Sequence, residues 1–245
     1  METTSYVALS RQAALWRQMD MVANNLANMN TPAFKAENMM FRDYVLQSRT
    51  ADRPFGDKTA YVQDVSIYRN MSEGAITETG NPLDVAIKGE GFMVVDTPQG
   101  QRYSRSGHFR LDESGQLVTA EGHPVLSTTD QPFFFAPNEQ SVSIAADGTV
   151  STENGQVGKL RLVKFENDQE LRKVSGGLYQ TEAQPQDVDK PHVVQGMIEG
   201  SNVLPVVEVG KMIQVQRSYE AVQRMIENEH ERVRKAIDVL GRTSR

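Results

Sequence analysis

Both ends of this 245-residue chain carry the pattern of a long amphipathic helix, and the stretch between them carries the pattern of β-strands. Over residues 8–29, apolar side chains recur every three or four positions and polar side chains occupy the opposite face. Over residues 212–240, the apolar positions follow steps of three and four, as in a coiled coil. The sequence therefore predicts an α+β protein, in which the terminal helices pair as a coiled-coil-like module and the middle forms an all-β domain.

The residues expected at the contact between the two helices lie on these apolar stripes. Glu229 interrupts the second stripe, and a polar residue at such a position can fix the register at some loss of stability. The pattern alone favours the core face of an ordinary globular helix over an assembly surface. The expected contact residues are Leu15, Met19, Val22 and Leu26 on the first helix, and Met212, Val215, Tyr219, Val222 and Ile226 on the last. The second stripe continues through Val233, Ala236, Ile237 and Leu240.

A proline marks the end of the first helix. The residue before a proline is pushed away from the helical region of backbone conformation, so the helix must end before Pro32. We expect the N-terminal segment that contains this helix to cover residues 1–35. Residues 36–79 mix apolar anchors with polar stretches. We expect them to form a packed but irregular connector, with a short helix near residues 38–48.

The hydrophobic period changes to two from residue 80 onward, which is typical of strands. We expect a strand over residues 83–88, a turn at 89–91 and a second strand over 92–95. Short apolar runs separated by Gly, Asn, Asp and Pro then continue, which predicts a central β domain over residues 80–192. A linker and the last helix are expected over residues 193–245.

The composition excludes several functional classes. The formal net charge is −6 and the pI is near 5.3, and no tract is rich in Lys or Arg, so nucleic acid is not an expected partner. The chain has no cysteine, which excludes disulfides, thiolate metal sites and cysteine nucleophiles. The histidines share no metal-ligand spacing, so we expect no metal site at His108, His123, His192 or His230.

The sequence also lacks the motifs of catalysis and cofactor binding. Residues 89–92 (GEGF) have no third glycine, following helix or Lys-Thr pair, so we expect a tight β turn and not a phosphate-binding loop. No Gly-x-Ser-x-Gly elbow is present. We therefore expect a protein that is not an enzyme and binds no cofactor. A secreted enzyme with a β catalytic domain stays open as an alternative, because catalytic groups can converge from distant positions.

The first residues, METTS, do not start a basic region followed by an apolar stretch. No segment approaches the roughly 20 consecutive apolar residues of a membrane-spanning helix. We therefore expect neither a cleaved leader nor direct membrane insertion.

Several stretches resemble the bacterial flagellar rod and hook proteins. Residues 23–32 (ANNLANMNTP) are similar to the signature of that family, two asparagine pairs with fixed alanines at a helix end. Residues 80–92 (GNPLDVAIKGEGF) resemble the start of its β domain, and residues 103–126 continue the resemblance. Residues 199–203 (EGSNV) and 216–221 (QRSYEA) resemble its closing helix motif.

The resemblance implies a structural subunit of the flagellar basal-body rod. Its terminal helices would stack into the inner tube of a hollow shaft that transmits torque, with the β domain as an outer layer. Its partners would be copies of itself, other rod subunits and the flagellar type III export apparatus, which would carry it without a cleaved signal peptide to the rod that spans the periplasm. We expect the asparagines of the signature to cap the first helix and to bond neighbouring backbone: Asn24, Asn25, Asn28 and Asn30.

Within the family, residues 1–12 and the chain length look most like a proximal rod component. A distal rod protein or a hook subunit stays as the alternative. Ala33 departs from the family's pattern, because a glycine is usual there and alanine tolerates positive φ poorly.

Overall fold

The computed structural model describes residues 2–47, 58–136, 139 and 141–243. The chain divides into two compact units. Unit 1 is formed by Met1–Ala27, Glu37–Arg69 and Leu204–Arg245, and unit 2 by Asn28–Ala36 and Asn70–Val203. The expected four-segment division did not anticipate that residues 28–36 and 70–79 group with the β domain.

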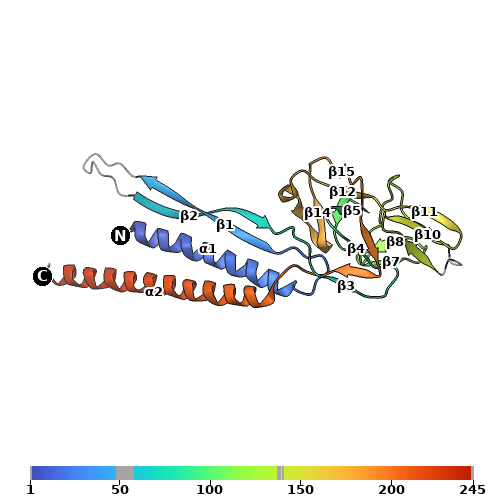
Figure 1. The fold of residues 1–245 in the computed structure, drawn as a ribbon. Helices are drawn as coiled ribbons and strands as arrows, with labels where there is room; N and C mark the ends of the chain where they lie inside the picture. The colour runs from blue at the N-terminus through green and yellow to red at the C-terminus, as the bar shows by residue number, and fades with distance from the viewer. Residues whose placement is uncertain (1, 48–57, 137–138, 140, 244–245) are drawn as a thin grey trace. The chain divides into compact units, whose positions relative to one another are not determined.

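Unit 1 is built from two helices and a β-hairpin. Helix α1 covers Glu2–Ala27 and helix α2 covers Pro205–Thr243. The two helices run side by side in opposite directions, and the hairpin of strands β1 and β2 packs on α1 (Figure 1). Helix α2 begins at a proline, which has no N–H to leave unpaired in the first turn. Helix α1 ends before Pro32, as predicted. The two terminal helices and the strand-rich middle confirm the α+β class.

The hairpin corrects the expected connector. Strand β1 covers Glu37–Gln47 and pairs antiparallel with strand β2, Lys58–Arg69, from Glu37 opposite Arg69 to Gln47 opposite Lys58. The short helix expected near residues 38–48 was therefore wrong over the described part, and residue 48 lies outside the described residues. The register shifts between Met40 and Phe41, and such a bulge breaks the alternation that would have identified a strand.

Unit 2 is all-β apart from two short 3₁₀ helices. Its main sheet has six strands in the order β13-β14-β6-β5-β12-β15, and a smaller sheet has the order β11-β10-β9. Strands β16 and β4, β17 and β3, and β7 and β8 form separate pairs. The first strands are β3 Ile76–Glu78, β4 Val85–Ile87, β5 Phe92–Thr97, β6 Gly100–Ser104, β7 Phe109–Leu111, β8 Leu117–Thr119 and β9 Val142–Ile144. They are followed by β10 Thr149–Thr152, β11 Gly155–Lys159, β12 Leu162–Lys164, η1 Asp168–Glu170, β13 Arg172–Lys173, η2 Ser175–Gly177, β14 Leu178–Gln180, β15 Gln186–Asp187, β16 Val193–Gln195 and β17 Met197–Glu199.

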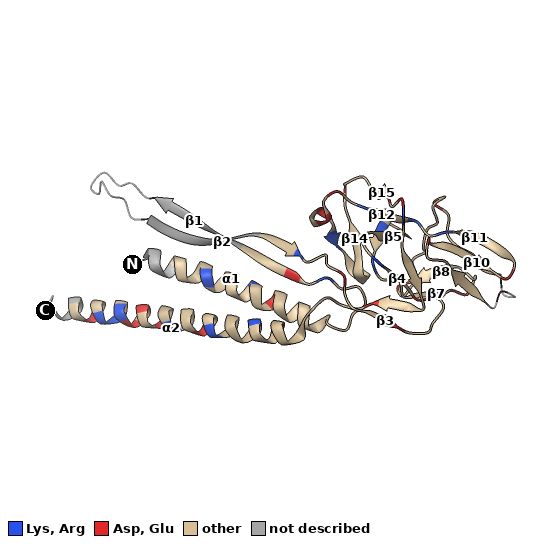
Figure 2. Cartoon of the chain, viewed as in Figure 1, with Lys and Arg blue, Asp and Glu red and all other residues tan. Residues whose placement is uncertain are grey.

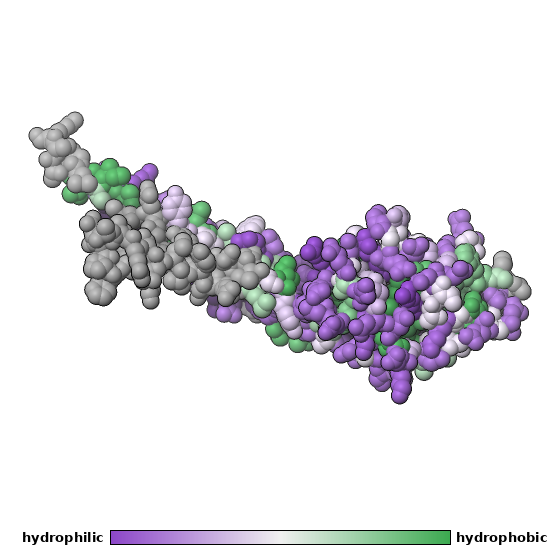
Figure 3. Space-filling model, turned by 90° about the horizontal axis from the view of Figure 1, so that it is seen from above, coloured by the Kyte–Doolittle hydropathy of each residue, from purple (hydrophilic) through white to green (hydrophobic). Residues whose placement is uncertain are grey.

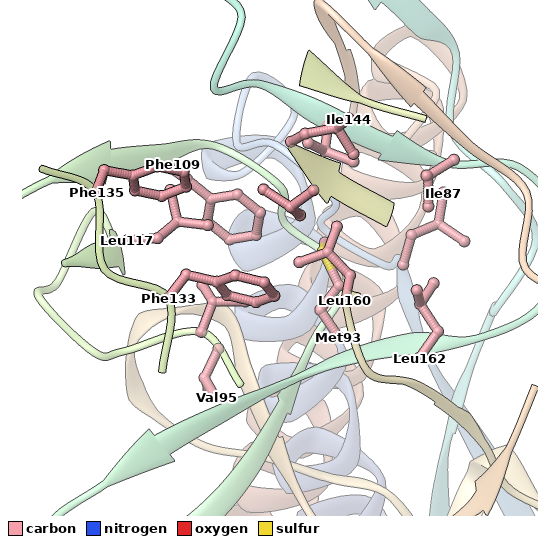
Figure 4. Packing of buried hydrophobic residues seen from close by; sticks show 14 of the residues in the cluster. Ile87, Met93, Val95, Phe109, Leu117, Phe133, Phe135, Ile144, Leu160 and Leu162 are labelled. Carbon is pink, nitrogen blue, oxygen red and sulfur yellow. The ribbon is translucent and has the colours of Figure 1, made fainter. Parts of the chain in front are cut away.

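The core of unit 2 lies on both faces of strand β5. Because successive side chains of a strand point to opposite faces, Met93 and Val95 enter the larger apolar cluster, whereas Phe92 and Val94 enter a second one. In the larger cluster, Met93 and Val95 lie with Leu117, Phe133 and Leu160 (Figure 4). The strand–turn–strand predicted at residues 83–95 is confirmed by β4 and β5.

The β region extends further than predicted. Residues 193–199, expected in the linker, form strands β16 and β17, which pair with β4 and β3. These short strands belong to two-stranded ladders whose partners lie more than 100 residues earlier, so local alternation did not reveal them. The last strand of unit 2 thus ends only a few residues before α2 begins.

Charged side chains are unevenly distributed along α2, and they gather on its second half (Figure 2). Unit 2 has a mostly hydrophilic surface in the view of Figure 3. The first turns of α2, by contrast, carry several exposed aliphatic side chains, including Val206 and Val207.

Candidate assembly surface

The predicted contact residues face the interior of unit 1. On α1, Val22 is buried and Leu15, Met19 and Leu26 are half-buried. On α2, Val215 and Val222 are buried, and Met212, Tyr219 and Ile226 are half-buried. The rings of Trp16 and Tyr219 lie 6.3 Å apart between centroids, so an aromatic contact joins the two helices. The apolar stripes therefore serve packing within the chain, as the pattern alone favoured, and their role in assembly stays a prediction.

Asn25 joins three elements of unit 1. Its side chain is 1 % exposed, donates to the Glu37 carbonyl at 2.8 Å and accepts from the Glu37 N–H at 3.0 Å. It also donates to Glu208 Oε2 at 3.1 Å. A buried side-chain amide with satisfied hydrogen bonds favours a single arrangement of the groups that it binds. Asn25 thus fixes the end of α1 against the start of β1 and the first turns of α2, which agrees with the expected bonding to neighbouring backbone.

Charged side chains continue this contact. Glu208 is 4 % exposed and accepts a hydrogen bond from Lys211 at 2.6 Å, and Lys211 also donates to Asn38 at 3.0 Å. Arg69 donates to Glu37 at 2.8 and 3.1 Å. The ends of β1, β2 and α2 are therefore tied together within unit 1.

The other asparagines of the signature have different positions. The Asn28 side chain accepts a hydrogen bond from the Thr31 hydroxyl at 3.1 Å, while Asn24 and Asn30 are exposed. Ala33 follows at a φ of 56°, the left-handed region that the usual glycine would favour. It is held there by the hydrogen bond from its N–H to the Glu199 carbonyl, 2.8 Å long.

A buried ion cluster holds the chain segments of unit 2 where they leave for unit 1. Lys35 Nζ lies 2.5 Å from Glu199 Oε1 and 2.7 Å from the Ser72 carbonyl. Arg105 Nε lies 2.7 Å from Glu199 Oε2, and the Gly74 N–H donates to Glu199 Oε1 at 2.9 Å. Asn202, from the closing motif, donates to the Asn70 and Ser72 carbonyls and accepts from the Ala36 N–H, respectively at 2.8, 3.0 and 2.7 Å. Sequence reasoning missed this cluster, because its members lie far apart in the chain.

The protonation of the cluster follows from its geometry. Burial lowers the pKa of the Lys35 ammonium, and the hydrogen bond and charge of Glu199 offset that effect only in part. Burial alone would raise the pKa of Glu199, but Arg105 and the hydrogen bonds from Lys35, Arg105 and Gly74 outweigh it, so the pKa is lowered. Glu199 is therefore the anion that compensates two buried cations.

Sequence reasoning also missed two exposed apolar stripes on the helices. The α1 stripe consists of Tyr6, Leu9 and Trp16, which are 63 %, 58 % and 55 % exposed. The α2-start stripe consists of Val206, Val209 and Ile213, which are 86 %, 44 % and 47 % exposed. The residues of each set recur at helical spacing. A second apolar periodicity in each helix could therefore have revealed these stripes from the sequence. Grouped exposed apolar residues of this kind mark interaction sites.

Charged groups line one cavity of unit 2, and the two cations among them are already paired. The cavity has a volume of about 260 Å³ and is lined in part by Lys35, Glu73 and Arg105. Lys35 and Arg105 are engaged by Glu199 and by backbone carbonyls. Among the described side chains, no group of three or more His, Cys, Asp or Glu is placed to bind a metal ion. Within the part of the chain that the structure describes, no helix is both long and apolar enough to cross a bilayer.

Comparison with known proteins gives matches along the chain. The flagella basal body rod protein family matches residues 6–35, the flagellar hook protein FlgE/F/G D1 domain matches residues 86–152, and the flagellar basal body rod FlgEFG protein C-terminal family matches residues 194–239. The flagellar basal-body rod protein FlgF of Caulobacter vibrioides is 39 % identical over 245 residues, with 99 % of each chain covered. The chain belongs to the FlgF family of flagellar basal-body rod proteins.

Further relatives agree with this assignment. FlgF of Mesorhizobium japonicum is 34 % identical with all of both chains covered, and FlgG of Bacillus subtilis is 30 % identical with 96 % of this chain and 97 % of its own covered. The FlgF-family chain is a structural subunit of the flagellar basal-body rod and not an enzyme. The matched regions include Asn25, Lys35 and Glu199, whereas Glu37, Ser72 and Gly74 lie between the matched regions.

Proposed function

We propose that this FlgF-family chain polymerises through its terminal helices into the proximal part of the rod, a hollow shaft that transmits torque. The observation that carries the proposal is the double apolar character of both helices. One face of each is used inside unit 1, and the α1 and α2-start stripes remain exposed. Its partners in assembly are copies of itself and other rod subunits.

The same proposal includes the route to the rod. The chain is exported by the flagellar type III apparatus, and the rod that it joins spans the periplasm. A chain without cysteine suits this route, because no disulfide can form before passage. Helices of this kind draw most of their stability from packing, so they gain order as they meet neighbouring subunits.

The α1–α2 contact is proposed to act as a coiled-coil-like module that shapes the assembly surface. Tyr219→Pro should leave unit 2 folded and abolish incorporation into the rod, because proline costs about 3 kcal/mol inside a helix. Tyr219→Phe is the matched control, since it keeps both the helix and the ring that faces Trp16. Incorporation is scored by immunoblot of isolated basal bodies, and circular dichroism checks the β fold. Normal incorporation of Tyr219→Pro would contradict the role of the helix pair in assembly.

Position along the rod is tested by deleting the gene in the source bacterium and imaging isolated basal bodies by electron microscopy. Loss of the rod beyond its proximal base, with the export gate and membrane ring intact, supports the proximal assignment. A rod that lacks only its distal section favours the distal alternative, whose FlgG representatives are also among the relatives. Complete motile flagella would refute both.

A further inference from the structure

Strands β10 and β11 are joined by a tight turn that holds the only Asn-Gly pair of the sequence (Figure 1). Glu153 and Asn154 form the loop, and the pairing of Thr152 with Gly155 closes it. Asn154 and Gly155 are both exposed. Gly155 has a φ of 127°, which a residue with a Cβ atom rarely adopts, so the turn depends on this glycine. The turn thus exposes to water an asparagine that is followed by a glycine.

An asparagine before a glycine can react with its own main chain. The backbone nitrogen of the glycine attacks Cγ of the asparagine, so that an N–Cγ bond forms, the Cγ–Nδ2 bond breaks, and ammonia leaves with the proton of the attacking nitrogen. Glycine allows this attack because no side chain crowds its nitrogen. Water then opens the succinimide ring at either carbonyl group, which gives aspartate or isoaspartate. Every other asparagine of the chain precedes a residue with a side chain.

The amide of Asn154 belongs to a network around the Glu139 carboxylate. Asn154 Nδ2 donates to Glu139 Oε1 at 3.1 Å, and the Thr152 hydroxyl donates to the same oxygen at 2.7 Å. The Ala136 N–H donates to Glu139 Oε2 at 2.8 Å. The hydrogen bond from Thr152, followed by those from the other two donors, lowers the pKa of the Glu139 carboxyl, so this group is an anion at neutral pH. We call the contacts of Glu139 with Thr152 and Asn154 the hairpin clasp, because they hold the end of the β10–β11 hairpin.

We propose that Asn154 is a site of spontaneous deamidation, and that its conversion opens the hairpin clasp. Either product replaces the donating amide by a carboxylate, where the amide nitrogen lay 3.1 Å from Glu139 Oε1. Two carboxylates at such a distance repel each other, and neither has a proton to donate at neutral pH. Isoaspartate also adds a methylene group to the main chain, which disturbs the pairing of Thr152 with Gly155. The reaction needs only water and is independent of the proposed rod function.

The fold restrains both reacting groups. The clasp holds the amide, and the closing pair of the hairpin holds the backbone of Gly155. We therefore expect the folded chain to react more slowly than the unfolded chain. Release of the amide requires the loss of its hydrogen bond to Glu139, at an exposed site where water can replace that bond. The restraint thus slows the reaction and does not abolish it.

The preceding turn, between β9 and β10, provides a comparison within the same chain. Asp147 also precedes a glycine, Gly148, whose φ is 84°. The Asp147 carboxylate accepts hydrogen bonds from the Thr149 N–H at 3.1 Å and from the Thr149 hydroxyl at 2.9 Å, and these bonds lower its pKa. An ionised carboxylate resists attack by a backbone nitrogen. We therefore expect isoaspartate at residue 154 and little at residue 147.

Mass spectrometry of the full-length protein tests the site. The folded protein is incubated for weeks at neutral pH and digested, and a sample digested at once corrects for conversion during digestion. Deamidation replaces NH2 by OH and so changes the peptide mass, and fragmentation separates isoaspartate from aspartate. We expect residue 154 to convert at least several-fold faster than any other asparagine. A sample kept unfolded in urea should convert faster still at this residue.

Variants test the effect on the clasp. Asn154→Asp has the charge of the product, so it should lower the hydrogen-exchange protection of β10 and β11 several-fold, while that of β5 stays unchanged. Adding Glu139→Gln to Asn154→Asp removes the repulsion and should restore part of the protection. Asn154→Gln is the matched control, since it keeps an amide but forms the corresponding larger ring far more slowly. Its protection should stay constant during the incubation.

Other outcomes overturn the inference. Conversion of residue 154 in the folded protein at no more than the rate of the other asparagines would refute the site, and so would conversion confined to the sample in urea. Unchanged protection of β10 and β11 in Asn154→Asp would show that the charge does not open the clasp. A loss of protection that Glu139→Gln leaves uncorrected would remove Glu139 from the explanation.

Discussion

The buried carboxylate Glu199 should contribute far more to the stability of unit 2 than the buried ammonium Lys35 beside it. Glu199→Gln keeps the side-chain shape but leaves Lys35 without its carboxylate partner and Arg105 with only Glu73, at 3.4 Å. One orientation of the amide also presents N–H groups to a cation. Removing one partner from a buried ion cluster typically costs about 3–5 kcal/mol. We expect a loss in this range.

Lys35→Met should cost less, below about 2 kcal/mol. Glu199 would keep its bonds to Arg105 and to the Gly74 N–H, and the Ser72 carbonyl would keep the Asn202 amide at 3.0 Å. The lost charged hydrogen bond is worth about 1.5–3 kcal/mol, and relief from burying an ammonium offsets part of it. The two substitutions at one contact are therefore expected to differ by at least about 1 kcal/mol.

Amide hydrogen exchange of the full-length protein measures the difference. Protection of strand β5, at the centre of unit 2, reports the free energy of opening that unit without interference from the helices. Lys164→Met, on an exposed position of β12, is the control for loss of a lysine charge. The reasoning fails if Lys35→Met lowers the protection of β5 as much as Glu199→Gln does.

Two further predictions concern the same region. Because the pKa of Glu199 is lowered in the folded protein, the stabilisation by its carboxylate is present above its ordinary pKa of 4.5 and is lost as the pH falls through the lower folded value. The protection of β5 should therefore fall less steeply with pH below 4.5 in Glu199→Gln than in the wild type. An equally steep fall in both proteins would contradict the role given to the Glu199 carboxylate. Ala33→Gly should change the stability of unit 2 by less than about 1 kcal/mol. Glycine relieves the left-handed backbone strain of about 1–2 kcal/mol, but it also removes a buried methyl group and raises the entropy of the unfolded chain. Ala33→Val should instead cost about 1–3 kcal/mol, because a branched side chain resists positive φ; equal thermal unfolding midpoints for the two variants would be evidence against the strain.

The sequence was sufficient for features that depend on local pattern. The helices and the strands at residues 83–95 follow from periodicity within a few turns or residues, and the end of α1 follows from Pro32. The β1–β2 hairpin was missed because a bulge at Met40 and Phe41 interrupts the alternation, and pairing across the chain is not encoded in either strand alone.

The candidate surface was predictable only in part. The inward contact residues were found because one stripe dominates each helix, whereas the α1 and α2-start stripes form a weaker second periodicity. The ion cluster could not be found, since Lys35, Arg105 and Glu199 become neighbours only after the β ladders form. Charged residues in sequence are usually solvated, so no local signal distinguished these three.

The division of unit 1 into three chain segments has a consequence for synthesis. Helix α1 is made first, but its partner α2 begins only at Pro205, after all of unit 2. At a ribosomal rate of about 5–20 residues per second, the nascent chain carries α1 without its partner helix α2 for about 10–35 s. During that interval unit 2 can complete its ladders, and the face of α1 around Val22 is open to any factor in the cell that binds apolar helices. The chain therefore stays vulnerable to misassociation until α2 has been made and packs on α1.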